Sequence, residues 1–177
     1  MSQLTLRSPA KLNLFLHITS QRADGYHNLQ SVFQLIDLCD VMHIDTSYTD
    51  LSINAITHVT DSENSCLKAA QLLQRKTSFA GGCRIHIEKN IPIGGGLGGG
   101  SSNAATTLLA LNQLWQTGLS LNQLAALGLQ LGADVPIFIY GQNAWAEGVG
   151  EQLTSVKLPQ TDYIVLKPDC FISTEHL

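Results

Sequence analysis

The sequence predicts one domain that combines β-strands with α-helices. Its 177 residues suit a single domain, because a chain of about 150 residues already buries roughly 70% of its unfolded surface. Several stretches alternate between apolar and polar residues, as half-buried strands do, whereas others repeat apolar residues at helical spacing. Between the two kinds lies a stretch, Gly94 to Gly100, in which six of seven residues are glycine.

The strand-like stretches lie mainly in the first half of the chain. The longest covers residues 4–18, where Leu12, Leu14, Leu16 and Ile18 share one face and Lys11, Asn13, Phe15 and His17 share the other. Further strands are expected at residues 29–36, 41–44, 51–53, 84–88 and 162–167, and a hairpin at 144–151. Helices are expected at residues 66–76, from 101–103 to about 115, and at 120–131, where Ser120 and Gln123 form a capping-box pattern and Gly132 is placed to end the helix.

Composition excludes several classes of function. The net charge is −4 with ten Lys and Arg, which gives no electrostatic footprint for a nucleic-acid partner. The four cysteines have neither paired spacing nor a common zinc pattern, so we expect buried, reduced thiols and a reducing compartment. No run of 18 apolar residues and no apolar signal-peptide core occur. We therefore expect a cytoplasmic protein with no membrane partner, in an oligomeric state that the sequence leaves open.

The glycine stretch is the strongest functional signal. Glycines supply no side chain to a core and lose much conformational entropy on folding. A phosphate offsets that cost, since consecutive backbone N–H groups can converge on an anion and a following helix adds its free amides and positive dipole end. We expect this helix to start at residues 101–103, where Ser and Asn are favoured caps. A flexible linker is the alternative, but linkers are not normally flanked by a strand-like run and an immediate helix start.

The better-known phosphate loops do not fit this stretch. A Walker loop requires Lys after the last glycine, where Ser101 stands. A dinucleotide fingerprint needs an acidic residue about 20 positions further on, and no Asp or Glu occurs between Glu88 and Asp134. The His-Arg-Asp and Asp-Phe-Gly tripeptides of protein kinases are absent.

Two pairs of residues near the N-terminus are candidates for ligand contacts. Lys11 and Asn13, two residues apart on a strand, project about 7 Å from each other and could reach one small polar ligand; an ordinary solvent-facing strand is the alternative. After the Asp-Gly turn, Tyr26 and His27 offer a stacking face and hydrogen-bonding nitrogens that could hold a planar base. On these residues alone, a plain turn is the more common explanation.

Three further residues have both a structural and a functional interpretation. Asp134 is the first carboxylate after the glycine stretch and could be catalytic or could cap a short turn. Lys89 is the last Lys or Arg before Lys157, so positive charge near the loop must come from Lys11, Lys89 or a metal; a solvated strand end is the alternative for Lys89. Asn64 lies in a cluster that is adequately explained as helix capping.

These motifs together resemble the GHMP small-molecule kinase family. Its phosphate loop is similar to Pro-x-x-x-Gly-Leu-Gly-Ser-Ser and opens a helix, as the segment from Pro92 to Ser102 does here. Residues 8–14, Ser-Pro-Ala-Lys-Leu-Asn-Leu, residues 22–27, Arg-Ala-Asp-Gly-Tyr-His, and residues 131–136, Leu-Gly-Ala-Asp-Val-Pro, resemble the branch of the family that acts on a CDP-linked polyol.

The resemblance implies a fold and a domain division. The fold is α+β, that of the GHMP kinase N-terminal domain (ribosomal protein S5 domain 2-like), with a mixed sheet packed against helices. Residues 1–160 would form this ATP-binding domain. Residues 161–177 would begin a C-terminal GHMP domain that is otherwise absent, since the family's third motif, resembling Gly-Thr-Gly-Ala, does not occur.

The resemblance also implies ATP-dependent phosphorylation of an alcohol, with ATP, Mg²⁺ and a CDP-linked polyol as the small molecules bound. By this carry-over Lys11 and Asp134 are catalytic, and Asn13, Tyr26 and His27 bind the acceptor. The nucleotide would be bound by Asn64, Lys89, Pro92, Ile93, Gly94, Gly95, Gly96, Leu97, Gly98, Gly99, Gly100, Ser101 and Ser102, and the metal ligands stay unspecified. Two alternatives remain: a GHMP kinase for another alcohol such as mevalonate or homoserine, and a non-catalytic nucleotide-binding module.

Overall fold

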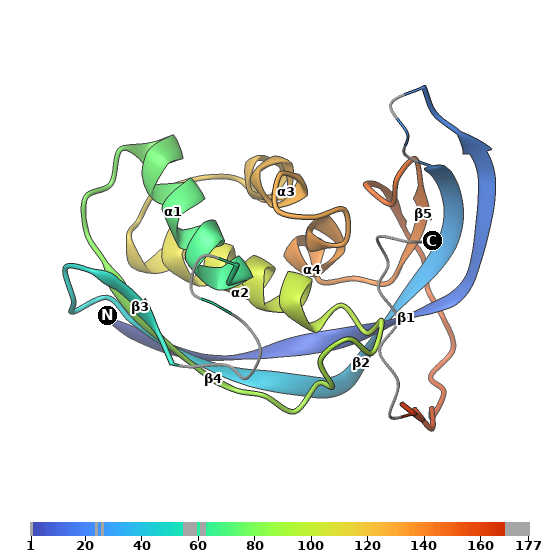
Figure 1. The fold of residues 1–177 in the computed structure, drawn as a ribbon, viewed down its shortest axis with the longest axis horizontal. Coiled ribbons are helices and arrows are strands. Elements are labelled where there is room, and N and C mark those ends of the chain that lie inside the picture. The colour runs from blue at the N-terminus through green and yellow to red at the C-terminus, as the bar shows by residue number, and fades with distance from the viewer. Residues whose placement is uncertain (1, 24, 26, 55–59, 61–62, 169–177) are drawn as a thin grey trace.

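The computed structural model describes residues 2–23, 25, 27–54, 60 and 63–168, and it has the two-layer arrangement of an α+β domain. Figure 1 shows the helices gathered over one face of a long, curved sheet. The strands are β1 (Gln3–Gln21), β2 (His27–Asp45), β3 (Leu51–Ile53), β4 (Cys83–Glu88), β5 (Ala144–Glu147) and β6 (Gln152–Ser155). The helices are α1 (Ser65–Thr77), α2 (Gly99–Leu114), α3 (Leu121–Leu129) and α4 (Val135–Tyr140).

The sheet is mixed, as the family resemblance implied. Its strand order is β3-β4-β2-β5-β6, and β1 pairs with β2 along the whole length of both strands. Only the β3–β4 pair is parallel among the described strands. Because β2 pairs with β1 on one side and with β4 and then β5 on the other, it is the central strand that connects the two ends of the sheet.

Most expected elements are present, with some boundaries changed. The two strands expected at 29–36 and 41–44 are one strand, β2, and the hairpin expected at 144–151 is formed by β5 and β6. The capping box of α3 is present, but α3 ends at Leu129 with Gln130 as its C-cap, ahead of Gly132. The strand expected at 162–167 was wrong: residues 161–168 are irregular, and Ile164 and Leu166 are 92% and 86% exposed. An alternating pattern forms a strand only where a neighbouring strand accepts its hydrogen bonds.

A bulge in β1 changes which side chains share a face. Asn13 lies opposite Phe33 and Leu16 lies opposite Ser31, so three steps along β1 match two along β2. An extra residue reverses the alternation beyond it. Leu16 therefore lies on the same side of the sheet as Asn13, contrary to the strict alternation expected from the sequence, and it is 47% exposed.

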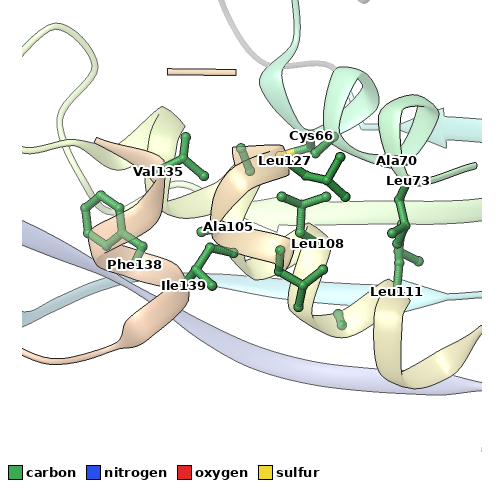
Figure 2. Close-up of a cluster of buried hydrophobic side chains, with 14 of the residues drawn as sticks. Cys66, Ala70, Leu73, Ala105, Leu108, Leu111, Leu127, Val135, Phe138 and Ile139 are labelled. Carbon is green, nitrogen blue, oxygen red and sulfur yellow. The ribbon is translucent and has the colours of Figure 1, made fainter. Parts of the chain in front are cut away.

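The core lies between the helices and the sheet. Leu73 of α1 and Leu108 and Leu111 of α2 are fully buried, and they belong to one cluster with buried residues of α3 and α4 (Figure 2). From the sheet, Met42 and Ile85 face the same cluster. Helix α2 contacts α1, α3, α4, β1 and β2, so the start of α2 is fixed from several sides.

The structure can be compared with two expectations drawn from composition, the buried thiols and the lack of a membrane-spanning segment. Cys66 and Cys83 are buried free thiols, and Cys39 is a partly buried one, whereas Cys170 lies outside the described residues. Burial raises the pKa of Cys66 to about 11 and the pKa of Cys83 to about 12. Within the described ranges, no helix has the length and apolar character needed to cross a lipid bilayer.

Candidate functional site

The glycine stretch forms a turn that ends directly at the start of α2. Gly94, Gly96 and Gly98 have positive φ angles of 70°, 70° and 72°. Gly98 is the N-cap of α2 and makes no side-chain cap bond. The helix thus begins two residues before the expected start at Ser101, and the expectation that Ser or Asn caps it was wrong. A cap in the left-handed conformation favours glycine, which has no Cβ to strain.

This start leaves backbone amides at the end of the helix without helical partners. The first bond of α2 runs from the Ser102 N–H to the Gly98 carbonyl, at 2.8 Å. The N–H groups of Gly99, Gly100 and Ser101 precede that bond and have no acceptor within the helix. Free amides at the positive end of a helix bind anions. The geometry therefore suits a phosphate at this point.

The loop is packed against the domain, which a flexible linker would not be. The Lys11 N–H donates to the Leu97 carbonyl at 3.0 Å, and the Leu97 side chain is 4% exposed beside Ala10 and Ile91. A Cβ on Gly98 would lie 2.8 Å from Cζ of Phe138 and 3.2 Å from Cγ of Lys11. The loop therefore fits closely between β1 and α4, and the linker interpretation was wrong.

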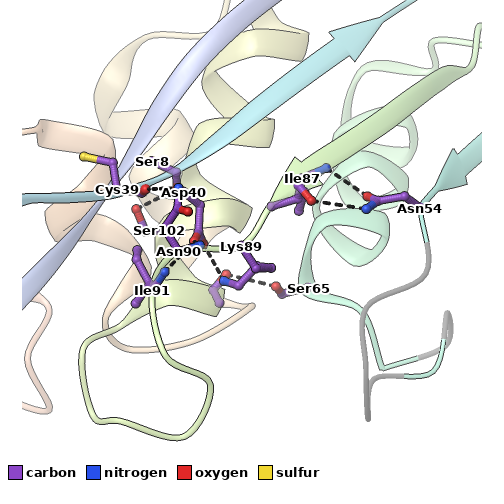
Figure 3. Close-up of polar contacts among 11 residues, drawn as sticks. Ser8, Cys39, Asp40, Asn54, Ser65, Ile87, Lys89, Asn90, Ile91 and Ser102 are labelled. Atoms are coloured by element: carbon purple, nitrogen blue, oxygen red, sulfur yellow. Dashed lines mark hydrogen bonds and ion pairs between the residues drawn. The ribbon is translucent and has the colours of Figure 1, made fainter. Parts of the chain in front are cut away.

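The two serines at the start of α2 have different surroundings. Ser102 is fully buried, and its hydroxyl accepts a hydrogen bond of 2.8 Å from the Ser8 hydroxyl of β1 (Figure 3). Ser101 is only partly buried. Ser102 therefore holds the helix against the sheet, and Ser101 is the serine that a ligand can reach.

Lys11 and Asp134 are brought together beside this loop. The Lys11 ammonium lies 3.0 Å from the Asp134 carboxylate and donates to the Asn13 side-chain oxygen at 2.6 Å. It also lies 4.5 Å from the centre of the Phe33 ring, which gives a cation–π contact. Lys11 is 3% exposed, whereas Asp134 is 36% exposed. The solvent-facing alternative for Lys11 was wrong, and the structure brings three predicted site residues into contact.

The capping alternative for Asp134 was also wrong. Asp134 does precede α4, but its backbone is helical and its side chain makes no cap hydrogen bond. Its carboxylate pairs with Lys11 instead. A partly exposed carboxylate next to a buried ammonium can accept a proton from an alcohol, or orient that alcohol, while the cation faces a charged group.

The side chain of Lys89 reaches the start of α2 and pairs with a residue that the sequence analysis did not name as a candidate. Its ammonium forms an ion pair with Asp40 of β2, which is fully buried, and Lys89 is 21% exposed. A Cβ on Gly99 would lie 3.4 Å from the Lys89 nitrogen. Alternation along β2 puts Asp40 on the side of the buried Met42 and Ile44. A charged residue at a core-facing position was the signal that could have revealed it.

Asn64 and His27 belong to other parts of the fold and have contacts of their own. Asn64 is the N-cap of α1, and its side chain accepts a hydrogen bond of 2.9 Å from the Cys66 N–H. The capping interpretation is thus confirmed, and a nucleotide contact by Asn64 stays a prediction. His27 is half-buried at the first position of β2, opposite Gln21, at the far end of the hairpin from Lys11. Tyr26 lies outside the described residues.

Comparison with known proteins finds similarity to one family of kinases. A family model described as "GHMP kinases N terminal domain" matches residues 64–142, the segment from the cap of α1 to the end of α4. A protein of Acinetobacter baylyi named 4-diphosphocytidyl-2-C-methyl-D-erythritol kinase is 62% identical over 177 aligned residues, which cover 98% of this chain and 63% of the relative. A Haemophilus ducreyi protein of the same name is 53% identical, with 100% and 64% covered. The chain thus spans less than two thirds of the length of these relatives.

Solved structures give the same result for the fold. The crystal structure of a 4-(cytidine 5′-diphospho)-2C-methyl-D-erythritol kinase superposes with a TM-score of 0.78 and 41% identity, covering 88% of this chain and 56% of that one. The mevalonate kinase of Methanococcus jannaschii superposes with a TM-score of 0.65 at 20% identity, with the same two coverages. At that identity the second likeness concerns the fold alone.

Proposed function

We propose that this chain, which carries the N-terminal domain of the GHMP kinases, belongs to a kinase that transfers a phosphoryl group from ATP to the 2-hydroxyl of 4-diphosphocytidyl-2-C-methyl-D-erythritol, in non-mevalonate isoprenoid synthesis. The observation that carries the proposal is the contact of Lys11 with Asp134, 3.0 Å apart, beside the free amides of α2. The names of the relatives support the choice of acceptor.

Phosphoryl transfer needs positioning and charge neutralisation more than covalent help from the protein. In our proposal the amides of Gly99, Gly100 and Ser101 hold the phosphates of ATP at the start of α2. Lys11 stabilises the charge on the transferring group through its positive charge. Its buried ammonium is held in position by the hydrogen bond to Asn13 and by the Phe33 ring. Asp134 accepts the proton of the attacking hydroxyl or orients that hydroxyl. The hydroxyl oxygen thus loses its proton as it forms the new bond to the γ-phosphorus, and the bond from that phosphorus to the bridging oxygen breaks, so that ADP leaves.

The charges near the loop support the inclusion of a metal ion in this proposal. Lys11 pairs with Asp134 and Lys89 pairs with Asp40, so each cation is matched by a carboxylate. Within the described residues, no group of three or more His, Cys, Asp or Glu side chains is arranged to hold a metal. Mg²⁺ is usually bound largely by phosphates and waters, and it would supply the remaining neutralisation, with the Ser101 hydroxyl as the protein ligand.

Recognition of the cytidine end is the part of the proposal that separates this acceptor from other alcohols. We assign Tyr26 and His27 to the base, because an aromatic face and imidazole nitrogens suit a planar heterocycle. Mevalonate and homoserine contain no nucleobase. Replacing both residues with alanine should therefore raise the Michaelis constant for the CDP-linked acceptor and leave that for ATP unchanged.

Acceptor-dependent ADP release tests the proposal. The chain is incubated with ATP and Mg²⁺ and with each of the three alcohols in turn, and His86→Ala, on the neighbouring strand β4, serves as the control for the hairpin double variant. Release with the CDP-linked acceptor alone is the expected result. Release with mevalonate or homoserine would assign a different member of the family, and ATP binding without release would indicate a non-catalytic nucleotide-binding module.

A further inference from the structure

The carboxylate of Asp40 is completely buried in the sheet, and each of its oxygens has a separate function. Oδ1 accepts hydrogen bonds from the N–H groups of Asn90 and Ile91, at 2.8 and 2.9 Å. Oδ2 accepts from the ammonium of Lys89 (Figure 3). Asp40 is 0% exposed. A charge is stable at such a depth only if it is paired and hydrogen-bonded, and here both conditions are met.

All three donors belong to the short segment that joins β4 to the glycine loop. The same segment is held a second time, since the Asn90 side chain donates to the Cys39 carbonyl at 2.9 Å. The central strand β2 therefore fixes the entrance of the loop through two consecutive residues, Cys39 and Asp40. Without the carboxylate, two backbone amides next to the core would lose their acceptor.

Lys89 is held in a position where it can act on a ligand. Its ammonium lies beside the first residue of α2, because a Cβ on Gly99 would lie 3.4 Å from it, and it is partly accessible. A lysine side chain has several rotatable bonds and would otherwise sample many positions. The charge-assisted bond to Asp40 selects the position at the helix start.

We propose that Asp40 is a positioning residue for nucleotide binding: it does not touch the nucleotide, but it holds Lys89 and the loop entrance in the arrangement that binds ATP at the start of α2. This inference rests on the proposed function, because it assumes that the ligand of this helix start is ATP. It adds a determinant of ATP affinity on a strand, β2, that carries no other residue assigned to ATP.

The separate functions of the two oxygens make Asp40→Asn the informative change. The asparagine carbonyl can still accept from Asn90 and Ile91, whereas its NH₂ group replaces the oxygen that faces the Lys89 ammonium. The hydrogen bonds at the loop entrance are kept, and the bond that positions Lys89 is lost.

Because a hydrogen bond to a charged group is worth more than an ordinary one, we expect the dissociation constant of ATP to rise by about tenfold or more in Asp40→Asn. The Michaelis constant of the acceptor should not change, and kcat should change less than the Michaelis constant of ATP.

A double-mutant cycle tests whether Asp40 acts through Lys89. ATP binding is measured by titration calorimetry on the full chain for Asp40→Asn, Lys89→Met and the double variant, with urea unfolding in parallel. If Asp40 acts through Lys89, the double variant binds ATP as weakly as Lys89→Met does. Asn112→Ala is the matched control, since the Asn112 side chain holds the backbone of Leu119 at the other end of α2. It should lower stability and leave ATP affinity within about twofold.

The outcomes separate the inference from the function on which it rests. Additive losses, or a folded Asp40→Asn that binds ATP as the unchanged chain does, would overturn the positioning function and leave the proposed kinase standing. An unchanged chain that binds no ATP would overturn both. If Asp40→Asn does not fold, ATP binding by the double variant is compared with ATP binding by Lys89→Met. The double variant leaves neither charge unpaired. A different dissociation constant in these two variants, in either direction, contradicts the inference.

Discussion

The ammonium of Lys11 lies 3.0 Å from the carboxylate of Asp134, although Lys11 belongs to the first strand and Asp134 directly precedes α4. The contact joins the two layers of the fold at the point where the glycine loop enters α2. Lys11 and Leu97 also share a backbone hydrogen bond. The position of the ion pair relative to the loop is therefore set by the backbone as well as by side chains.

Gly98→Ala tests the fit of the loop. Alanine at a φ of 72° is strained, and its Cβ would lie 2.8 Å from Phe138. Strain of this kind costs on the order of 1–3 kcal/mol, so urea unfolding should show a clear loss of stability, together with weaker ATP binding. Gly96→Ala is the matched control, because Gly96 has a similar φ of 70° but a Cβ added there would meet nothing within 4 Å. Equal losses in the two variants would show that Phe138 does not restrict the loop.

The parts of the fold that the sequence predicted are those with local signals. Alternation identified β1 and β4, the Ser120 and Gln123 pattern identified the start of α3, and six glycines identified the turn that leads into α2. The bulge after Asn13 had no such signal, because it depends on how β1 pairs with β2. The start of α2 was misplaced because serine is a good cap in general, whereas a left-handed glycine here precedes it.

The site was predicted residue by residue, but its contacts were not. Lys11, Asn13 and Asp134 were named, yet nothing in the chain order shows that Lys11 is buried and contacts both of the others. Asp40 belongs to none of the motifs that predicted the site, although its place on the face shared with Met42 marks it as an unusual charge in the core. A buried charge always requires a partner, and in the fold that partner is Lys89.

Lys11→Met should separate stability from activity. Methionine keeps an apolar stem of similar length, and the Asp134 carboxylate left behind is 36% exposed and therefore reaches water. Removing the buried ammonium should therefore lower the free energy of unfolding by no more than about 1 kcal/mol, and can even raise it. Phosphoryl transfer should fall by about 10²-fold or more, as when an electrostatic donor to a developing charge is removed. Unchanged transfer, measured as ADP release at saturating ATP, would exclude Lys11 from the reaction.

The buried thiols predict a loss of stability at alkaline pH. Burial raises the pKa of Cys66 from 9.0 to about 11, so between these values the folded chain keeps a proton that the unfolded chain releases. The stabilising contribution is complete below about pH 9 and disappears as the pH rises through about 11. Urea unfolding measured across this range should show the decline, and Cys66→Ala should reduce its slope. Cys39→Ala, at a partly exposed thiol, serves as the control; an unaltered slope in Cys66→Ala would contradict the assignment.

The transfer of the phosphoryl group in a single turnover, compared between the unchanged chain and Asp134→Asn, tests the central claim most directly. Asparagine keeps the shape of Asp134 and removes the charge that pairs with Lys11, and in the proposed mechanism that carboxylate is the group that accepts the proton or orients the hydroxyl. With both variants saturated with ATP, Mg²⁺ and the CDP-linked acceptor, the proposed mechanism predicts that the rate falls by about 10²- to 10⁴-fold while ATP affinity stays within a few fold. Transfer at the same rate by both variants, or no transfer by an unchanged chain that binds ATP, would contradict it.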